Sequence, residues 1–520
     1  MKKTVIIISI LYILWGLLFF RETTFVTLDG ERNYCLFDDA MISMRYALNI
    51  ANGQGPVWNE GEKIEGYSNP LWVIIMTIPH LLFSKKASII IIQLLGIITT
   101  LLIALLSLKL FDAYSGSLSN GLLKKSHGIL YFVILFYYPF NYWSILGMES
   151  GLVIVLVLLA VLSTLGIQEK PHKKNFYLLS LLSGLLLLTR NDNLLPVLLL
   201  YSFIYFSSKN KTFDFRRSFF ISIFITIFIL LLQIAFRYFY YGKIIPNSFL
   251  LKISNKNIFY CIHDGIIFIK DFTISIIPFF IVVFLRKKLF KENYLFLFLM
   301  IIFLFISYQV WVGGDAWGLS RFLSAAVPFI TILFFIALAE VINKFACNLK
   351  EKYKSCLLIA GGLIFFFSLN ADYVKEICFL KLPYQVNENK ENVNTALLIN
   401  EFTDNNATVG VFWAGAISYY TERKTFDFLG KCDPYIANLN PYIQSNKWYK
   451  RIYHPGHDKV DLNYSILKLK PTYIQYFLES GDVLNFVEKN YIAVNIKDSR
   501  LHFLKDSPNV RWNKLKSYKN

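Results

Sequence analysis

Long apolar runs alternate with short polar gaps from residue 4 to about residue 370. Runs close to 20 apolar residues have the length of a membrane-spanning helix. The pattern predicts eleven spans, at residues 4–20, 87–110, 129–146, 151–167, 176–189, 194–207, 218–236, 272–285, 293–311, 322–343 and 356–370. The expected fold class is therefore an α-helical polytopic membrane protein.

The last part of the chain has a different pattern. Residues 371–520 contain no spanning run and carry Lys, Asn, Asp and Glu at the density of a soluble domain. Apolar, β-branched runs at 408–412 and 472–477 predict strands, and 389–404 and 480–490 predict helices. We therefore expect a transmembrane domain over residues 1–370 and a C-terminal α/β domain over residues 371–520.

Composition supports a membrane protein. Hydrophobic residues make up 55% of the chain, and the formal net charge is +18. The positive residues gather in short gaps between apolar runs, which is a topology signal and does not indicate nucleic-acid binding. The basic, apolar residues 1–20 are followed by Arg21 and Glu22 without a small-residue cleavage site, so we expect an uncleaved first span. The six cysteines form no CxxC pair, and free thiols are expected.

Charge also predicts the orientation. With Lys2 and Lys3 in the cytoplasm, alternate gaps at 111–128, 168–175, 208–217, 286–292 and 344–355 are cytoplasmic, and all are basic. An odd number of spans then places residues 371–520 outside the cell membrane. The apolar segment 70–83 must not span, and its length, Pro79 and His80 favour a helix lying at the interface. The first outer loop is thus 21–86, with juxtamembrane helices.

The polar motifs fall in the outer gaps, and the predicted cytoplasmic gaps carry little beyond Lys, Arg and turn residues. These motifs are DDAMISMRYALNIANGQGP from residue 38, LGMES at 146–150, TRNDN at 189–193, RYFYYGKIIPNSFLLK at 237–252 and WVGGDAWGLSRF at 311–322. This asymmetry points to a site on the outer face of the membrane.

Each motif also has a structural interpretation. From Asp38 to Ile50 the spacing is helical, and Asp38 and Asp39 are placed to cap that helix. Glu149 begins a predicted span, where an acid is favoured, and Arg190, Arg237 and Arg321 sit at span ends, where they can reach lipid headgroups. GGD at 313–315 suits a tight turn, and His454 and His457 suit an ordinary surface.

In order along the chain, these motifs resemble the GT-C superfamily of glycosyltransferases, specifically the subgroup of the cell-wall β-1,2-arabinofuranosyltransferase. The resemblance rests on DDAMISMRYA with NEGEKIEGYSNPLW, LGMES, YYGKIIPNSFLLK, GGDAWGLSRF, and ISYYTERKTFDFLGKCDPYIA with PGHDK. It implies transfer of a sugar from a polyprenyl-phosphate donor to an envelope glycan, lipid or protein at the extracytoplasmic face of the cell membrane.

The resemblance also implies roles for residues. It places the catalytic carboxylate at this pair, with Asp38 the first candidate for the base and Asp39 the close second; the two side chains point about 100° apart on a helix, and the sequence alone does not separate them. The candidates to bind the negatively charged lipid phosphate are the cations Arg321, Lys252 and Arg237. The remaining candidates for sugar or acceptor contacts are Arg45, Glu65, Tyr67, Glu149, Arg190, Asp315 and His457.

The cofactor and the exact activity stay open at this stage. No cofactor is required, and if a divalent ion takes part, Asp38, Glu65 and Glu149 offer oxygen ligands for Mg or Mn. A single base and inversion at the anomeric centre are expected, since no second nucleophilic carboxylate is needed. The alternatives are an envelope polysaccharide polymerase or ligase and a transporter of lipid-linked sugars. A transporter would carry ionisable groups at mid-membrane, whereas here they lie at span ends.

Overall fold

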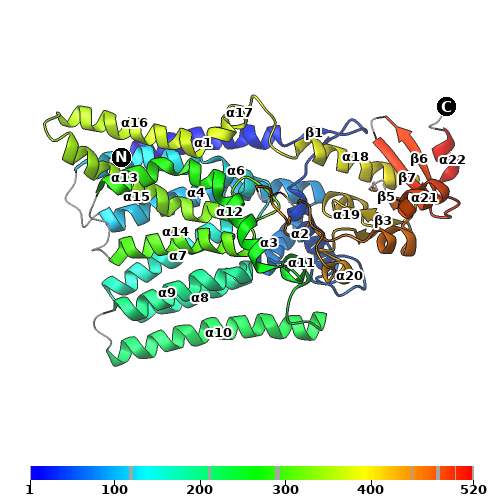
Figure 1. Ribbon diagram of the computed structural model, residues 1–520, viewed down its shortest axis with the longest axis horizontal. Helices are drawn as coiled ribbons and strands as arrows, with labels where there is room; N and C mark the ends of the chain where they lie inside the picture. The colour runs from blue at the N-terminus through cyan, green and yellow to red at the C-terminus, as the bar shows by residue number, and fades with distance from the viewer. Residues whose placement is uncertain are drawn as a thin grey trace.

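The structure, a computed structural model, describes residues 2–115, 121–208, 212–286, 293–445, 447, 449–475, 481–497 and 499–517. Long helices run side by side along the longest axis, and a mixed domain of strands and helices lies at one end of this bundle (Figure 1). The chain is thus a helical polytopic membrane protein with a C-terminal region of mixed α/β structure.

The bundle is built from apolar helices joined by short connections. Its helices are α1 Lys2–Glu22, α4 Lys85–Ser115, α5 Gly121–Leu135, α6 Tyr138–Ile145, α7 Ser150–Glu169, α8 Lys173–Thr189, η1 Asn191–Asn193, α9 Leu194–Ser207, α10 Phe213–Tyr241, α12 Ile258–Ser275, α13 Ile277–Arg286, α14 Asn293–Val312, η2 Leu323–Ala326, α15 Val327–Phe345 and α16 Glu351–Leu369. Helix α15 is buried along most of its length, because α4, α5, α13, α14 and α16 pack around it.

Fewer helices reach spanning length than the hydrophobic pattern predicts. Among the described residues, seven helices are long and apolar enough to cross a membrane, or eight if the pair α12 and α13, bent by 66°, is one span. The predicted span 129–146 divides into α5 and α6 because Pro139 favours the first turn of a new helix. Helices α8 and α9 have 17 and 14 residues, fewer than the roughly 20 that a bilayer requires.

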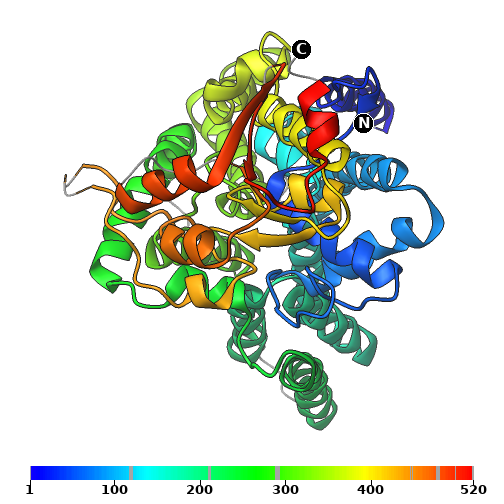
Figure 2. The same ribbon diagram turned by 90° about the vertical axis from the view of Figure 1, so that its right-hand side faces the viewer.

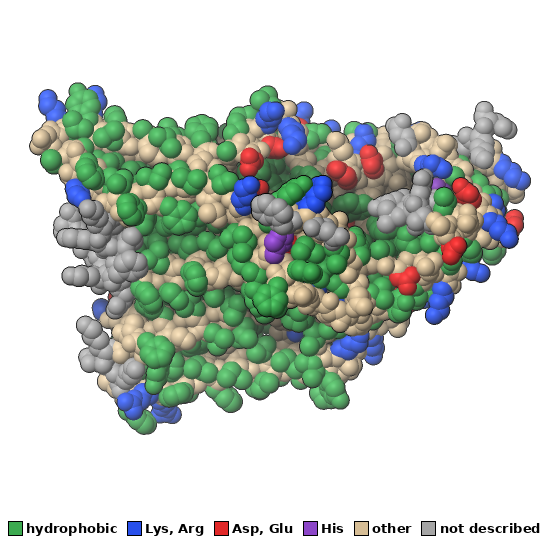
Figure 3. All heavy atoms as spheres, viewed as in Figure 1, with side chains coloured by type: hydrophobic (Ala, Val, Ile, Leu, Met, Phe, Trp, Pro, Cys, Tyr) green, Lys and Arg blue, Asp and Glu red, His purple; other side chains and the backbone are tan. Residues whose placement is uncertain are grey.

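The two ends of the bundle differ. The N-terminus and the connection from α15 to α16 lie at one end, and the C-terminal domain lies at the other (Figure 1). Apolar side chains cover the sides of the bundle, and Lys and Arg side chains gather at its outer ends (Figure 3). Large apolar side chains of the long helices, such as Phe224 and Phe228 of α10 and Phe303 of α14, are exposed. An exposed apolar belt of this kind fits a surface in contact with lipid.

The first loop folds against the C-terminal end of the molecule. It contains the antiparallel pair β1 Phe25–Val26 and β2 Arg32–Asn33, then α2 Asp38–Ala51 and α3 Pro70–Leu82. Helix α2 begins at the predicted Asp38. Helix α3 has 13 residues, too few to span, and exposes Ile74, Ile78 and Leu81 while burying Val73 and Met76. A short apolar helix is therefore present within residues 70–83 as expected, and its place at the membrane interface stays a prediction.

The C-terminal domain contains a five-stranded sheet in the order β4-β3-β5-β7-β6. Strand β3 Thr408–Val411 pairs in parallel with β4 Lys424–Asp427 and β5 Tyr473–Ile474, and β7 Ser499–Leu504 pairs antiparallel with β5 and β6 Tyr491–Ile496. The helices of this region are η3 Ala371–Tyr373, α17 Val374–Ile377, α18 Val386–Phe402, α19 Ala416–Thr421, α20 Pro434–Ala437, the π-helix η4 Asn463–Lys468, α21 Gly481–Asn490 and α22 Trp512–Ser517. Strand β3 and helices α18 and α21 confirm three predicted elements. Strand β5 is shorter than the predicted 472–477, of which residues 476–477 lie outside the described chain.

Hydrogen bonds fix this domain onto the first loop. The Asn389 amide donates to the carbonyl of Leu36 over 3.0 Å, and the Asn59 side chain both donates to and accepts from the backbone of Thr425 over 2.9 and 3.0 Å. Seen from the C-terminal end, the domain covers the ends of the bundle helices (Figure 2). The space between the two parts holds the candidate site.

Candidate functional site

A cavity of about 1510 Å³, partly open to solvent, lies between the bundle and the C-terminal domain. Its wall comes from α2, the segments 66–69 and 190–195, the short helix α11 Asn247–Ile253, and the loop after α14. The C-terminal domain contributes Lys431 and Pro455. Four acids and four bases line it: Asp39, Glu149, Asp192, Asp315, Arg190, Lys252, Arg321 and Lys431.

Arg321 connects two of these acids. Its guanidinium donates to Asp315 over 2.9 Å and to Asp39 over 3.2 Å, and it lies over the ring of Phe322. Gly314 makes the turn that brings Asp315 here, since its φ is +78° and an added Cβ would lie 2.4 Å from Phe268. Burial alone would raise the pKa of Asp39, but the charges of Lys431 and Arg321 hold that pKa below its usual range.

Arg190 is the centre of a second cluster. It donates to Glu149 over 2.8 Å and to both carboxylate oxygens of Asp192 over 3.0 and 2.7 Å. The hydroxyl of Tyr308 donates to Asp192 over 3.2 Å, and the Asn69 amide donates to Glu149 over 3.0 Å. Burial would raise the pKa of Glu149, but Arg190 and Arg321 lower it, so this carboxylate is held in its charged form.

Lys252 differs from the other cations of the cavity. Within the part of the chain that the structure describes, its ammonium has no hydrogen bond or ion pair, and its nearest ring is that of Phe322 at 5.9 Å. Burial, together with the charges of Arg321, Arg190 and Lys431, lowers the pKa of Lys252 to about 8 against the opposing charge of Asp315. Four cations therefore line the cavity, and among the described residues Lys252 is the one without an anionic partner, so it is free to bind an anion.

Asp38 and Asp39 have separate surroundings. The Asp38 carboxylate accepts hydrogen bonds from the backbone N–H groups of Gly415, over 3.1 Å, and Ala416, over 2.9 Å, at the start of α19. A Cβ on Gly415 would lie 1.9 Å from the Asp38 carbonyl oxygen, so only glycine allows this approach. Asp38 does not line the cavity and joins α2 to the C-terminal domain, whereas Asp39 faces the cavity.

The Asp38 contact predicts a pH dependence of stability. Burial raises the pKa of Asp38 to about 6, with Asp39 adding to the rise and Lys431 opposing it. The folded protein therefore holds a proton that the unfolded chain, with an ordinary Asp pKa of about 3.9, releases. The contribution of Asp38 to stability is greatest below about pH 4 and is lost as the pH rises to about 6.

Comparison with Asp38→Asn measures this contribution, because Asn keeps an acceptor oxygen for Ala416 and does not titrate. We expect the unfolding free energy of the wild type, relative to this variant, to fall by on the order of 2 kcal/mol between pH 4 and 7. Thermal unfolding at a series of pH values gives the difference. A constant difference across the range would contradict the assignment.

Arg237 and Glu65 bind each other away from the cavity. The Nε of Arg237 donates to both Glu65 oxygens over 2.9 Å, and both side chains are buried. Neither lines the cavity. The sequence placed Arg237 on a lipid phosphate and Glu65 on a sugar, and the structure instead places both in an ion pair between α10 and the first loop.

This ion pair gives a prediction that separates Arg237 from Lys252. Arg237→Gln leaves the buried Glu65 carboxylate without its partner, which typically costs about 3–5 kcal/mol of stability. We expect a lower unfolding temperature and unchanged affinity for a polyprenyl phosphate. Unfolding temperature and lipid binding are measured on the same preparation, and weaker lipid binding with unchanged stability would restore the phosphate role.

The other candidates divide in the same way. Tyr67 lines the cavity, and its hydroxyl lies 3.0 Å from that of Tyr241. His457 packs edge-on against Trp317 near Asp39, and burial lowers the pKa of His457 to about 4, so it is neutral. Arg45, a residue of α2, is buried and donates to the carbonyl of Trp58 over 3.1 Å. Of these three residues, only Tyr67 reaches the cavity wall.

The side chains proposed for a divalent ion do not come together. Asp38 is bound to α19, Glu65 to Arg237, and Glu149 to Arg190 and Asn69. Among the described residues, no three His, Cys, Asp or Glu side chains are close enough to hold a metal ion. The set Asp38, Glu65 and Glu149 therefore does not fit a Mg or Mn site in this arrangement.

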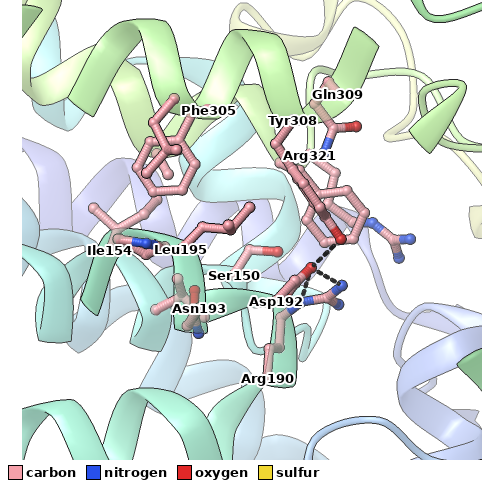
Figure 4. A pocket seen from close by; sticks show the side chains of 15 residues that line it. Ser150, Ile154, Arg190, Asp192, Asn193, Leu195, Phe305, Tyr308, Gln309 and Arg321 are labelled. Carbon is pink, nitrogen blue, oxygen red and sulfur yellow. Dashed lines mark hydrogen bonds and ion pairs between the residues drawn. The ribbon is translucent and has the colours of Figure 1, made fainter. Parts of the chain in front are cut away.

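An apolar crevice of about 500 Å³, partly open to solvent, lies beside the cavity between α7, α9 and α14 and shares several wall residues with it. Its walls include Val153, Ile154, Leu195, Leu304 and Phe305, and Arg190, Asp192, Tyr308 and Arg321 lie at its polar end. Figure 4 shows Ile154, Leu195 and Phe305 on one side and the Arg190, Asp192 and Tyr308 group on the other. The arrangement suits a ligand with an apolar chain and an anionic head.

The sequence interpretation left out two residues of the site. Asp192 stands in the TRNDN motif, from which only Arg190 was a candidate, and it is the bidentate partner of Arg190. Lys431 stands in GKCDP of the C-terminal domain, and its ammonium contacts Asp39. Its position in one of the motifs that carry the resemblance to GT-C glycosyltransferases was the one available signal in the sequence.

Comparison with solved structures shows the fold. ArnT from Cupriavidus metallidurans in the apo state has a TM-score of 0.50 and 11% identity, over 80% of this chain and 85% of that chain. The archaeal oligosaccharyltransferase AglB from Archaeoglobus fulgidus, with an inhibitory peptide and a dolichol phosphate, has a TM-score of 0.54 and 11% identity, over 98% of this chain and 75% of that chain. An Archaeoglobus fulgidus oligosaccharyltransferase with Zn and sulfate has a TM-score of 0.50 and 12% identity, over 91% and 67%. The fold therefore resembles that of ArnT and of the archaeal oligosaccharyltransferases.

Sequence comparison adds one match. Residues 383–511 match the family described as Domain of unknown function (DUF8728). No curated protein matches the sequence. The matched region includes α18, α19, the loop that carries Lys431, and Pro455.

Proposed function

We propose that this protein is a membrane glycosyltransferase that moves a sugar from a polyprenyl-phosphate donor to an envelope glycan, lipid or protein. The reaction takes place at the extracytoplasmic face of the cell membrane and inverts the anomeric centre. Asp39 is the general base. The donor sugar is a pentose or a hexose, and the first-loop resemblance to an arabinofuranosyltransferase is the reason to test a pentose first.

One observation carries the proposal. An apolar crevice between α7, α9 and α14 lies beside a cavity lined by Arg190, Lys252, Arg321 and Lys431, and Arg190 and Arg321 line both. A polyprenyl phosphate has the same two parts, an apolar chain and an anionic head. AglB, whose fold is similar, was determined with a dolichol phosphate. Donor binding with the chain in the crevice and the phosphate at Lys252 follows from this match.

The mechanism needs few groups. A lipid phosphate is already a good leaving group, so its departure requires stabilisation of negative charge, which Lys252 and Arg321 supply. The acceptor hydroxyl requires a base within hydrogen-bond reach. Asp39 is the carboxylate beside these cations, whereas Asp38 is occupied by α19. Attack from the face opposite the phosphate inverts the anomeric carbon.

Glu149, Asp192 and Asp315 serve the substrate in another way. Their carboxylates line the cavity and accept hydrogen bonds from Arg190 or Arg321. Each retains lone pairs for sugar hydroxyls. Tyr67 adds an aromatic face on the same wall.

The orientation follows from charge. With eleven spans, including the short helices α8 and α9 and the broken pair α5 and α6, the basic gaps lie in the cytoplasm. The cavity and the C-terminal domain then lie outside. Cysteines introduced at Ser68, at the cavity end, and at Lys354, at the opposite end, test this orientation. An impermeant thiol reagent added outside the cell should label the first and not the second.

The function is tested by mass spectrometry of envelope glycans from a deletion strain. We expect one sugar to be missing, and to return when the wild-type gene or the surface variant Lys424→Met is supplied. A glycan profile identical to that of the parent strain would overturn the proposal. The missing sugar and its attachment point identify donor and acceptor together.

A further inference from the structure

The C-terminal domain places a cation directly on the proposed base. Lys431 follows β4, and its ammonium contacts the Oδ1 of Asp39, 392 residues earlier in the chain. Arg321 holds the other oxygen of Asp39 at 3.2 Å. In the state described, both oxygens of Asp39 are therefore engaged by cations, whose charges lower the pKa of this carboxylate and make it a weak base toward a substrate hydroxyl.

Hydrogen bonds hold the backbone around Lys431 in place, so its ammonium changes position by rotation of the side chain. Asn247 at the start of α11 donates to the carbonyls of Gly430 and Lys431 over 2.9 and 3.0 Å. Asp427 accepts from the N–H groups of Leu429 and Cys432 over 2.9 and 2.8 Å. A lysine has a flexible four-carbon stem, so its charge can change partner without movement of this loop.

The Lys431 ammonium also lies close to Lys252, where we place the phosphate of the donor. Lys431, Arg321 and Arg190 all act on the ammonium of Lys252, which shows that the four cations share one electrostatic environment. A phosphate that binds Lys252 and Arg321 adds a second anion beside Lys431. The phosphate of the donor is a diester with one negative charge and two free oxygens that accept hydrogen bonds, so it can replace the Asp39 carboxylate as the partner of the Lys431 ammonium.

We infer that Lys431 is part of the lipid-phosphate site and blocks Asp39 until that phosphate binds. This inference rests on the proposed function. Without the donor, Lys431 pairs with Asp39. When the donor binds, the Lys431 ammonium turns to the phosphate, and one oxygen of Asp39 becomes free for the acceptor hydroxyl while Arg321 still orients the other. The donor consequently binds before the acceptor, and the region matched to a domain of unknown function supplies the coupling.

The test is a double-mutant cycle on binding of undecaprenyl phosphate, with no sugar attached, to the full-length protein in nanodiscs. Wild type, Asp39→Asn, Lys431→Met and the double variant are compared. Asp39→Asn releases Lys431, so we expect affinity to rise about tenfold with Lys431 present and about threefold or less in the Lys431→Met background. Lys424→Met, which removes a surface ion pair with Glu62 in the same domain, is the matched control and should leave affinity unchanged.

Two further results separate the possible failures. Equal gains from Asp39→Asn in both backgrounds would overturn the inference and leave the proposed function intact. No binding of undecaprenyl phosphate to the wild type would remove the proposed function and the inference with it.

For a measurement independent of variant folding, ¹³C-methylated lysines of the wild type are followed by NMR. The Lys431 signal, assigned from its loss in Lys431→Arg, should shift on lipid addition, and an unshifted signal would contradict the inference.

Discussion

Replacing Asp39 with Asn is expected to lower the rate of sugar transfer by about 100- to 10,000-fold, the range that a positioned general base contributes. Asn keeps the size of the side chain and can still accept a hydrogen bond from Arg321, but it cannot take the proton of an acceptor hydroxyl. Lipid binding should be retained, because the cations of the cavity remain in place. The rate is measured in membranes of the deletion strain that carry the variant.

Asp38→Asn is the matched control for this experiment, since it is the same substitution one residue away. Asp38 binds the start of α19 and does not line the cavity. We expect its variant to retain transfer at a rate within about tenfold of the wild type, with the altered pH dependence of stability described above. Loss of transfer in Asp38→Asn together with full activity in Asp39→Asn would reverse the assignment.

Replacing Lys252 with Met should give the second-largest effect. Removing one preorganised group that stabilises developing negative charge typically costs about 100- to 1,000-fold in rate. Among the described residues Lys252 has no hydrogen-bond or ion-pair partner, so Met leaves no buried acid unpaired. The unfolding temperature should therefore stay that of the wild type while transfer falls by about 100-fold and affinity for undecaprenyl phosphate weakens.

Lys243 provides the control for Lys252. It is an exposed lysine in the connection between α10 and α11, just before the helix that carries Lys252, and it does not line the cavity. Lys243→Met should bind the lipid and transfer sugar as the wild type does. If Lys252→Met also behaved as the wild type, the phosphate would have to bind elsewhere among the cations of the cavity.

Local patterns predicted much of the fold. The helical spacing from Asp38 predicted α2, and the short apolar run around Pro79 predicted the non-spanning α3. Span counting was less successful, because apolar composition does not show where a helix breaks. Pro139 divides one predicted span, and α12 and α13 meet at a bend of 66°.

The site was harder to predict because its decisive contacts are distant in sequence. Asp38 and Asp39 are equivalent in local pattern, and they differ only through contacts 378 and 392 residues away, at Ala416 and Lys431. Arg237 resembled a phosphate ligand at a span end, yet Glu65 lies 172 residues before it and neutralises it. Ion pairing across the fold therefore decides which charged residues remain available to a substrate.

The most direct test of this account is an experimental structure of the protein with undecaprenyl phosphate. The account predicts the phosphate about 3 Å from the Lys252 ammonium and the Arg321 guanidinium, with the chain between α9 and α14 and Asp39 on the opposite side of the cavity opening. A phosphate bound at Arg237, or a lipid chain outside the crevice lined by Leu195 and Phe305, would contradict it.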